Sequence, residues 1–199
     1  RAFRNRFVEI QVDELPSSEL GTILRAKCRL AESTANRLLS TYLELSRIRR
    51  LDNVLAGRDS ALITVRDLLR WGHRGPTTRE EIALEGYLVL AERLRTNDQK
   101  NFVIGVLEKN VGVKNLPKII QDFYDSESRK VFGGQAISLV QTSVLTRLVA
   151  LIHRAVSVGE SVLLVGETGT GKTSAVQLVS QILSALPLRI VNCHQHMES

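Results

Sequence analysis

The chain has 199 residues, of which 43% are hydrophobic and 24% charged, an ordinary composition that allows one or two compact units. No stretch approaches the roughly 18 unbroken apolar residues that span a bilayer, and Cys28 and Cys193 show no paired spacing of a disulfide framework. The net charge of +6 suits an anionic partner, although solvated helix faces would give the same excess.

The first two thirds of the chain predict one strand, a helical bundle and a connector. Residues 7–12 largely alternate apolar and polar side chains, which is the period of a half-buried strand. Residues 17–95 carry apolar side chains at helical spacing, so we expect a small bundle of amphipathic helices. Residues 97–135 give weaker helical patterns and include the Gly133-Gly134 turn signal. We therefore expect a connector with local structure there.

Two helix starts in the bundle show the spacing of a capping box. In such a box a threonine hydroxyl accepts from the backbone three residues on, and an acidic side chain reaches back to the threonine backbone. Thr64 and Asp67 have this spacing before an apolar run, and so do Thr77 and Glu80. The sequence predicts that one helix begins after each threonine.

The pattern changes near residue 136. A long amphipathic helix is expected over residues 137–155, followed by an almost wholly apolar run at 161–165 that fits a buried parallel strand. Residues 175–183 predict a second helix and 188–191 a second strand. The order predicts the α/β fold class, with a first βαβ unit of a parallel sheet. Because the chain begins without a methionine and stops just after an apparent strand, we expect a piece of a longer polypeptide.

A phosphate-binding loop lies between the first of these strands and its helix. The G-x-x-x-x-G-K-T pattern is formed by Gly166, Glu167, Thr168, Gly169, Thr170, Gly171, Lys172 and Thr173. Its glycines permit a concave nest of N–H groups, and the following helix N-terminus favours anions. Lys172 would reach the β- and γ-phosphates, and the Thr173 hydroxyl would ligate Mg²⁺. The sequence predicts binding of ATP with Mg²⁺.

The sequence gives less support for ATP hydrolysis by this chain, or for a metal ion bound by its side chains, than for ATP binding. The acidic group that completes Mg²⁺ binding normally lies on a later strand, and no strand pattern follows Val191. We therefore expect no catalysis by this chain alone. Cys193, His194 and His196 offer three metal donors, but structural zinc needs four ligands and the other histidines lie in unrelated segments. A loop after the second strand is the favoured interpretation.

Four motifs, in this order along the chain, resemble the midasin family of large dynein-related AAA+ ATPases. They lie at residues 2–9 (AFRNRFVE), 65–71 (VRDLLRW), 86–95 (GYLVLAERLR) and 163–173 (LLVGETGTGKT). The last motif by itself is shared by many families, and the order of motifs is the specific part. The resemblance implies a junction between two ATPase modules of one polypeptide.

The resemblance also implies a division of the chain. Residues 1–15 would close the α/β core of one AAA+ module, and residues 16–96 would form its helical lid. Residues 97–135 would connect the modules, and residues 136–199 would begin the next one, with its P-loop.

Two arginines receive roles from the same resemblance. Arg6 resembles the arginine finger that AAA+ proteins insert in trans into a neighbouring nucleotide site, where a cation neutralises developing charge. Arg66 resembles the sensor-2 arginine of the lid. Neither is expected to serve the Lys172 site, and a surface ion pair is the alternative for each.

The family implies a function for the whole protein. It would bind and hydrolyse ATP to release assembly factors from pre-60S ribosomal particles in the nucleus, with its own neighbouring modules as further partners and no membrane. Two alternatives remain at this point. One is a fragment of a DEAH-type RNA helicase, whose P-loop has a similar Gly-Glu-Thr-Gly run, and the other is a nucleotide-binding scaffold that does not hydrolyse.

Overall fold

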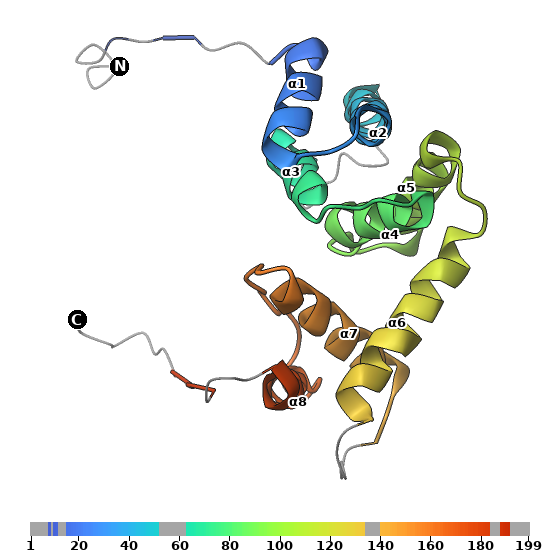
Figure 1. Cartoon of the computed structure of the whole chain (residues 1–199). Helices are drawn as coiled ribbons and strands as arrows, with labels where there is room; N and C mark the ends of the chain where they lie inside the picture. The colour runs from blue at the N-terminus through green and yellow to red at the C-terminus, as the bar shows by residue number, and fades with distance from the viewer. Residues whose placement is uncertain are drawn as a thin grey trace. The chain divides into compact units, whose positions relative to one another are not determined.

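The described part of the chain is built from helices. The computed structural model describes residues 8, 10, 11, 15–51, 63–133, 140–183 and 188–191. Its helices are α1 (Ser17–Cys28), α2 (Glu32–Leu51), α3 (Val65–His73), α4 (Arg79–Leu90), α5 (Asn97–Val111), α6 (Leu116–Phe132), α7 (Ser143–Ser157) and α8 (Lys172–Leu183) (Figure 1). They fall into two compact units, Arg1–Leu116 and Pro117–Ser199. Within those described residues, no helix combines the length and the apolar character that crossing a membrane requires.

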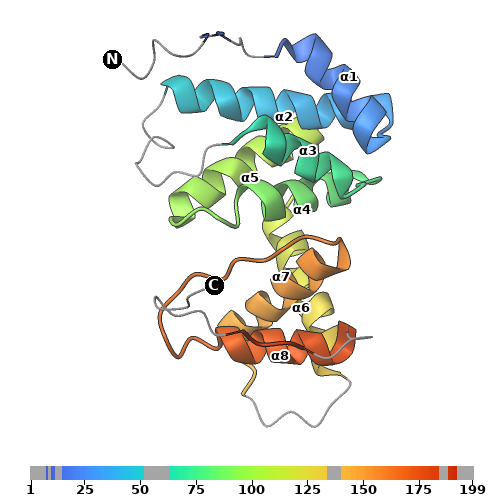
Figure 2. The same ribbon diagram turned by 90° about the vertical axis from the view of Figure 1, so that its left-hand side faces the viewer.

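The first unit packs its helices around α2. This helix contacts α1, α3, α4 and α5, and Figure 2 shows it between α1 and α5. Each helix buries one apolar stripe, because side chains three and four residues apart share a face. The largest fully enclosed side chains of this unit are Trp71, Leu24, Leu38, Leu45, Leu68, Ile82, Leu90, Leu107 and Leu116. The helices predicted from residues 17–95 are thus present as α1 to α4.

Capping boxes fix the starts of α3 and α4. At α3 the prediction is confirmed: the backbone N–H of Thr64 donates to the Asp67 carboxylate at 2.9 Å, and the Asp67 N–H donates to the Thr64 hydroxyl. At α4 the prediction was wrong by one residue, because the box is formed by Thr78 and Glu81. The chain offers two threonines followed by two glutamates at the same spacing. Thr78 has the extended backbone that an N-cap needs, and its hydroxyl accepts from the Glu81 N–H at 3.1 Å.

Trp71 on α3 is the largest fully buried side chain in the hydrophobic core of this unit. Its side chain is fully buried, and its indole Nε1–H donates to the backbone carbonyl of Ile82 at 3.0 Å. Gly86 on α4 lets the two helices approach closely. A Cβ at Gly86 would lie 2.6 Å from Trp71 Cζ2 and 2.8 Å from Leu107 Cδ2, distances that real Cβ atoms do not tolerate. The absence of a side chain at this position therefore creates the space that the indole fills.

Helix α5 packs within the first unit. It contacts α2 and α4, and its buried residues are Val103, Val106, Leu107 and Val111. Gly112 ends it with φ of +76°, a left-handed conformation that favours glycine. The compact unit extends to Leu116. The expected division of the chain at residues 15, 96 and 135 stays a prediction, and residues 97–111 are an integral helix of the bundle.

The second unit has a core of three helices. Helices α7 and α8 pack against each other, and α6 joins them through Val131. The buried members of this core are Val131, Leu145, Val149, Ile152, Ala175, Leu178 and Val179. The helix expected over 137–155 begins at Ser143, where the Thr142 hydroxyl accepts from the Leu145 N–H. Its buried residues are Leu145, Val149, Ala150, Ile152 and His153, whereas Val144 is 62% exposed.

The predicted α/β fold class is contradicted by the structure. The described residues form no strands, so no βαβ unit is present among them. Segments 161–165 and 188–191 form neither helix nor strand, and Leu163 and Val165 are each 87% exposed. Parallel strands are stable in a sheet covered on both faces, and the described residues supply no paired neighbours for these two segments. Of the strand predicted at 7–12, only residues 8, 10 and 11 are among the described residues.

Candidate nucleotide-binding site

The glycine loop leads directly into helix α8. Gly169 and Gly171 have φ of +84° and +82°, values that side chains rarely tolerate. Helix α8 then begins at Lys172, and the N–H of Ala175 donates to the carbonyl of Gly171 at 2.9 Å. The two glycines therefore turn the backbone at a helix N-terminus, where unpaired N–H groups and the helix dipole favour an anion. Residues 166–170 are exposed to solvent.

The ammonium group of Lys172 lies within the loop. Its Nζ donates to the carbonyl oxygens of Gly166 at 2.9 Å and Glu167 at 2.5 Å, and to the hydroxyl of Thr170 at 3.3 Å. The Thr170 hydroxyl donates to the Glu167 carbonyl at 2.9 Å. A fixed positive charge is thus placed among the backbone groups that the sequence assigns to phosphate binding.

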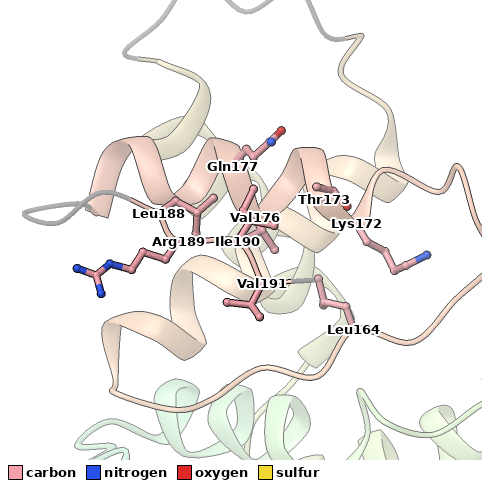
Figure 3. Close-up of a pocket in the computed structure, with 9 residues that line it drawn as sticks. All are labelled: Leu164, Lys172, Thr173, Val176, Gln177, Leu188, Arg189, Ile190 and Val191. Atoms are coloured by element: carbon pink, nitrogen blue, oxygen red, sulfur yellow. The ribbon is translucent and has the colours of Figure 1, made fainter. Parts of the chain in front are cut away.

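A pocket of about 340 Å³ opens beside this loop (Figure 3). Its lining is mainly apolar and includes Val176 of α8 together with Ile190 and Val191. Lys172 and Thr173 lie at its edge, and Figure 3 shows the Lys172 side chain extending away from Val176 and Ile190. The positive charge of the loop and the apolar pocket therefore lie side by side on the first turns of α8.

These residues fit a nucleotide phosphate. Two left-handed glycines, a helix N-terminus and an ammonium group converge on one loop, which is the donor set that phosphate oxygens require. The Thr173 hydroxyl, exposed on the first turn of α8, is the predicted Mg²⁺ ligand. No group of three His, Cys, Asp or Glu side chains that could hold a metal occurs within the described ranges. A cation at this site would depend on the phosphates for most of its ligands.

The loop rests on α7. A Cβ at Gly171 would lie 3.9 Å from Leu145 Cδ1, which is ordinary van der Waals contact. Leu145 belongs to the core that α7 and α8 share, and Leu164, just before the loop, packs against the same core. The segment before the loop and helix α8 after it therefore pack against one hydrophobic core.

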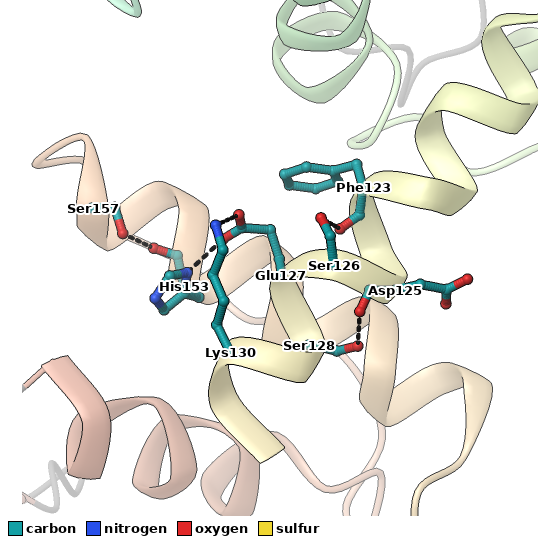
Figure 4. Close-up of polar contacts among 8 residues, drawn as sticks. All are labelled: Phe123, Asp125, Ser126, Glu127, Ser128, Lys130, His153 and Ser157. Carbon is teal, nitrogen blue, oxygen red and sulfur yellow. Dashed lines mark hydrogen bonds and ion pairs between the residues drawn. The ribbon is translucent and has the colours of Figure 1, made fainter. Parts of the chain in front are cut away.

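A buried ion pair between Glu127 and His153 joins α6 to α7 (Figure 4). Glu127 of α6 accepts from Nδ1 of His153 at 2.6 Å and also from Nζ of Lys130. Burial by itself raises the pKa of Glu127, but the hydrogen bonds and charges of Lys130 and His153 outweigh it, so the pKa lies below its usual 4.5. The ionised carboxylate therefore contributes stability above that pH, and this stability is lost as the pH falls through the lowered value.

The other predicted site residues lie in the first unit or outside the described residues. Arg66 is exposed on the first turn of α3, in the first unit, and no hydrogen bond or ion pair of Arg66 is found within the described part of the chain. Its role as sensor 2 stays a prediction. Arg6, the predicted arginine finger, lies outside the described residues, as do Cys193, His194 and His196.

The neighbour of Arg66 makes a contact that the sequence reasoning missed. Asp67 is buried and accepts two hydrogen bonds from Arg93, each at 3.0 Å. The two residues are 26 positions apart, so no helical spacing relates them. The first turn of α3, which carries Arg66, is therefore fixed from two sides, by the Thr64 box and by Arg93.

Comparisons with known proteins match two consecutive parts of the chain to two different family models. Residues 19–114 match a family model described as the midasin AAA lid domain, and residues 124–199 match one described as the P-loop containing dynein motor region. The chain is 38% identical over 213 aligned residues to midasin of Dictyostelium discoideum and 33% identical over 226 to midasin of Giardia intestinalis. All of this chain is covered in both cases, and it spans about 4% of the length of each relative.

Proposed function

This chain belongs to the midasin family, and we propose that it is a segment of a multi-module AAA+ ATPase that binds ATP with Mg²⁺ at residues 166–173. The observation that carries the proposal is the loop itself, with the Lys172 ammonium held among its carbonyls at the start of α8. Consecutive matches to a lid and to a P-loop motor region support a junction between two modules. A lid match before the P-loop favours this function over that of a DEAH-type helicase.

The residues of this chain have separate tasks in the proposed reaction. Bound ATP with Mg²⁺ supplies the phosphoryl group to be transferred and a cation that draws charge from it. The loop amides and Lys172 bind and orient the phosphates, and Thr173 offers a hydroxyl to the cation. Arg66 acts on the nucleotide bound by the module whose lid this chain contains, and Arg6 acts in trans on the nucleotide of a neighbouring module. Neither arginine acts at the Lys172 site.

We further propose that the whole protein uses ATP hydrolysis to remodel pre-60S ribosomal particles and release assembly factors from them, in the nucleus. Membership of the midasin family supports this role. The neighbouring AAA+ modules of the same polypeptide would supply the catalytic groups that act on the nucleotide at Lys172 and would transmit its changes.

The test is ATP turnover by the full-length protein. We expect Lys172→Ala to lower turnover, because the site loses the cation that binds the phosphates. Lys118→Ala is the matched control, since Lys118 is an exposed lysine of α6 far in sequence from the loop, and it should leave turnover unchanged. Turnover that is equal in wild type and Lys172→Ala would instead identify a structural site that does not hydrolyse ATP.

A further inference from the structure

The ammonium group of Lys172 has no free donor in the loop. A lysine ammonium carries three N–H donors, and Lys172 directs them to three acceptors: the Gly166 carbonyl, the Glu167 carbonyl and the Thr170 hydroxyl. All three acceptors belong to the loop that would hold the phosphates. Before Lys172 can bind a phosphate oxygen, at least one of these bonds has to open.

Thr170 closes a ring of hydrogen bonds. Its single hydroxyl proton is donated to the Glu167 carbonyl at 2.9 Å, so its oxygen is left to accept from Lys172 at 3.3 Å. The Glu167 carbonyl in turn accepts from both Thr170 and Lys172. The bond from Lys172 to Thr170 is the longest of the three ammonium bonds, which makes it the first to open.

We propose that Thr170 is a positioning residue, whose hydroxyl holds Lys172 in a self-bonded state that competes with binding of the ATP phosphates. The inference rests on the proposed nucleotide binding at this loop. When a binding-competent state is only part of the population, the apparent affinity falls by that fraction. Phosphate oxygens displace the hydroxyl because hydrogen bonds between two charged groups are stronger than those to a neutral acceptor.

The prediction concerns Thr170→Val, which removes the hydroxyl and keeps nearly the same side-chain shape. We expect Mg·ATP to bind the 199-residue chain about two- to tenfold more tightly than in wild type, the range set by one net hydrogen bond. Thr170→Ser restores the hydroxyl and should return the affinity towards the wild-type value. Titration calorimetry measures each dissociation constant.

The matched control is Thr22→Val. Thr22 is exposed on α1, and its hydroxyl donates to the Ser18 carbonyl at 3.2 Å, so the same chemical group is removed from another backbone acceptor in the first unit. This variant should bind Mg·ATP as wild type does. Equal or weaker binding by Thr170→Val, compared with wild type, would overturn the inference.

A second measurement examines the ring without nucleotide. In NMR spectra of the ¹⁵N-labelled chain, the Lys172 ammonium protons should exchange with water more slowly in wild type than in Thr170→Val. Equal exchange rates would show that the ring does not hold Lys172, and would overturn the inference. Failure of Lys172→Ala to weaken Mg·ATP binding would contradict the proposed function instead, so the two failures are distinguishable.

Discussion

Replacement of Trp71 by alanine is expected to lower the free energy of unfolding of the first unit by about 3–5 kcal/mol. The indole is fully buried, so its removal leaves a large cavity and deletes the hydrogen bond that Nε1 donates to the Ile82 carbonyl. Gly86 lies against the indole and has no side chain that could fill the cavity. Because domains are stable by about 5–15 kcal/mol, we expect the variant to be close to unfolding. Urea titration followed by circular dichroism measures the change.

Trp71→Phe is the control for this variant. It keeps an aromatic ring in the core but loses the hydrogen bond to Ile82, so we expect a smaller loss of about 1–2 kcal/mol. A loss below 1 kcal/mol for Trp71→Ala would contradict the central place of Trp71 in the core.

Asp67→Asn is expected to destabilise the same unit by about 1–3 kcal/mol at neutral pH. The substitution keeps the shape of the side chain but removes the charge that binds Arg93 through two bonds of 3.0 Å. The Asp67 side chain is 7% exposed, whereas that of Arg93 is 30% exposed, so solvent reduces the effect below that of a fully buried pair. Trp71 is the only tryptophan, and its fluorescence reports unfolding of this unit.

The effect of Asp67→Asn should depend on pH. Burial raises the pKa of Asp67, but hydrogen bonds from Arg93 and Thr64 together with the Arg93 charge bring it below the usual 3.8. A lowered pKa contributes stability above the unfolded value and loses it as the pH falls through the folded value. The difference between wild type and variant should therefore be full near pH 7 and shrink below about pH 4.

The matched control is Glu44→Gln. Glu44 on α2 pairs with Lys109 on α5 at 2.9 Å, but the Lys109 side chain is 71% exposed, so we expect a loss of at most about 1 kcal/mol. An Asp67→Asn loss no larger than that of Glu44→Gln, or one that is the same at pH 7 and pH 3, would contradict the account of the Arg93 pair.

Local signals predicted local features of the fold. The Thr64 box was found because its residues are three positions apart, and the helices of the bundle because their apolar residues repeat at helical spacing. The box at α4 was misplaced by one residue, since neighbouring threonines and glutamates give the same spacing twice. A helical pattern was recognised within residues 97–135, but the packing of α5 against α2 and α4 is not visible in its own sequence.

The strands predicted at 161–165 and 188–191 are absent for a different reason. Residues 161–165 have the apolar run of a buried strand, but a strand exists only where a neighbour completes its hydrogen bonds, and sequence pattern does not report the neighbour. The glycine loop was predicted from the sequence, but the long-range side-chain pairs were not. The loop at 166–173 has a local spacing that identifies it, whereas the pairs Asp67–Arg93 and Glu127–His153 each join residues 26 positions apart.

The most direct test of the account is a calorimetric titration of Mg·ATP into the 199-residue chain, in wild type and in Lys172→Ala. We expect saturable binding of one nucleotide to wild type. We also expect an affinity about ten- to hundredfold weaker in the variant, the value of one hydrogen-bonded charge. Equal affinities in the two chains, or no saturable binding to wild type, would contradict the claim that this loop is a nucleotide site.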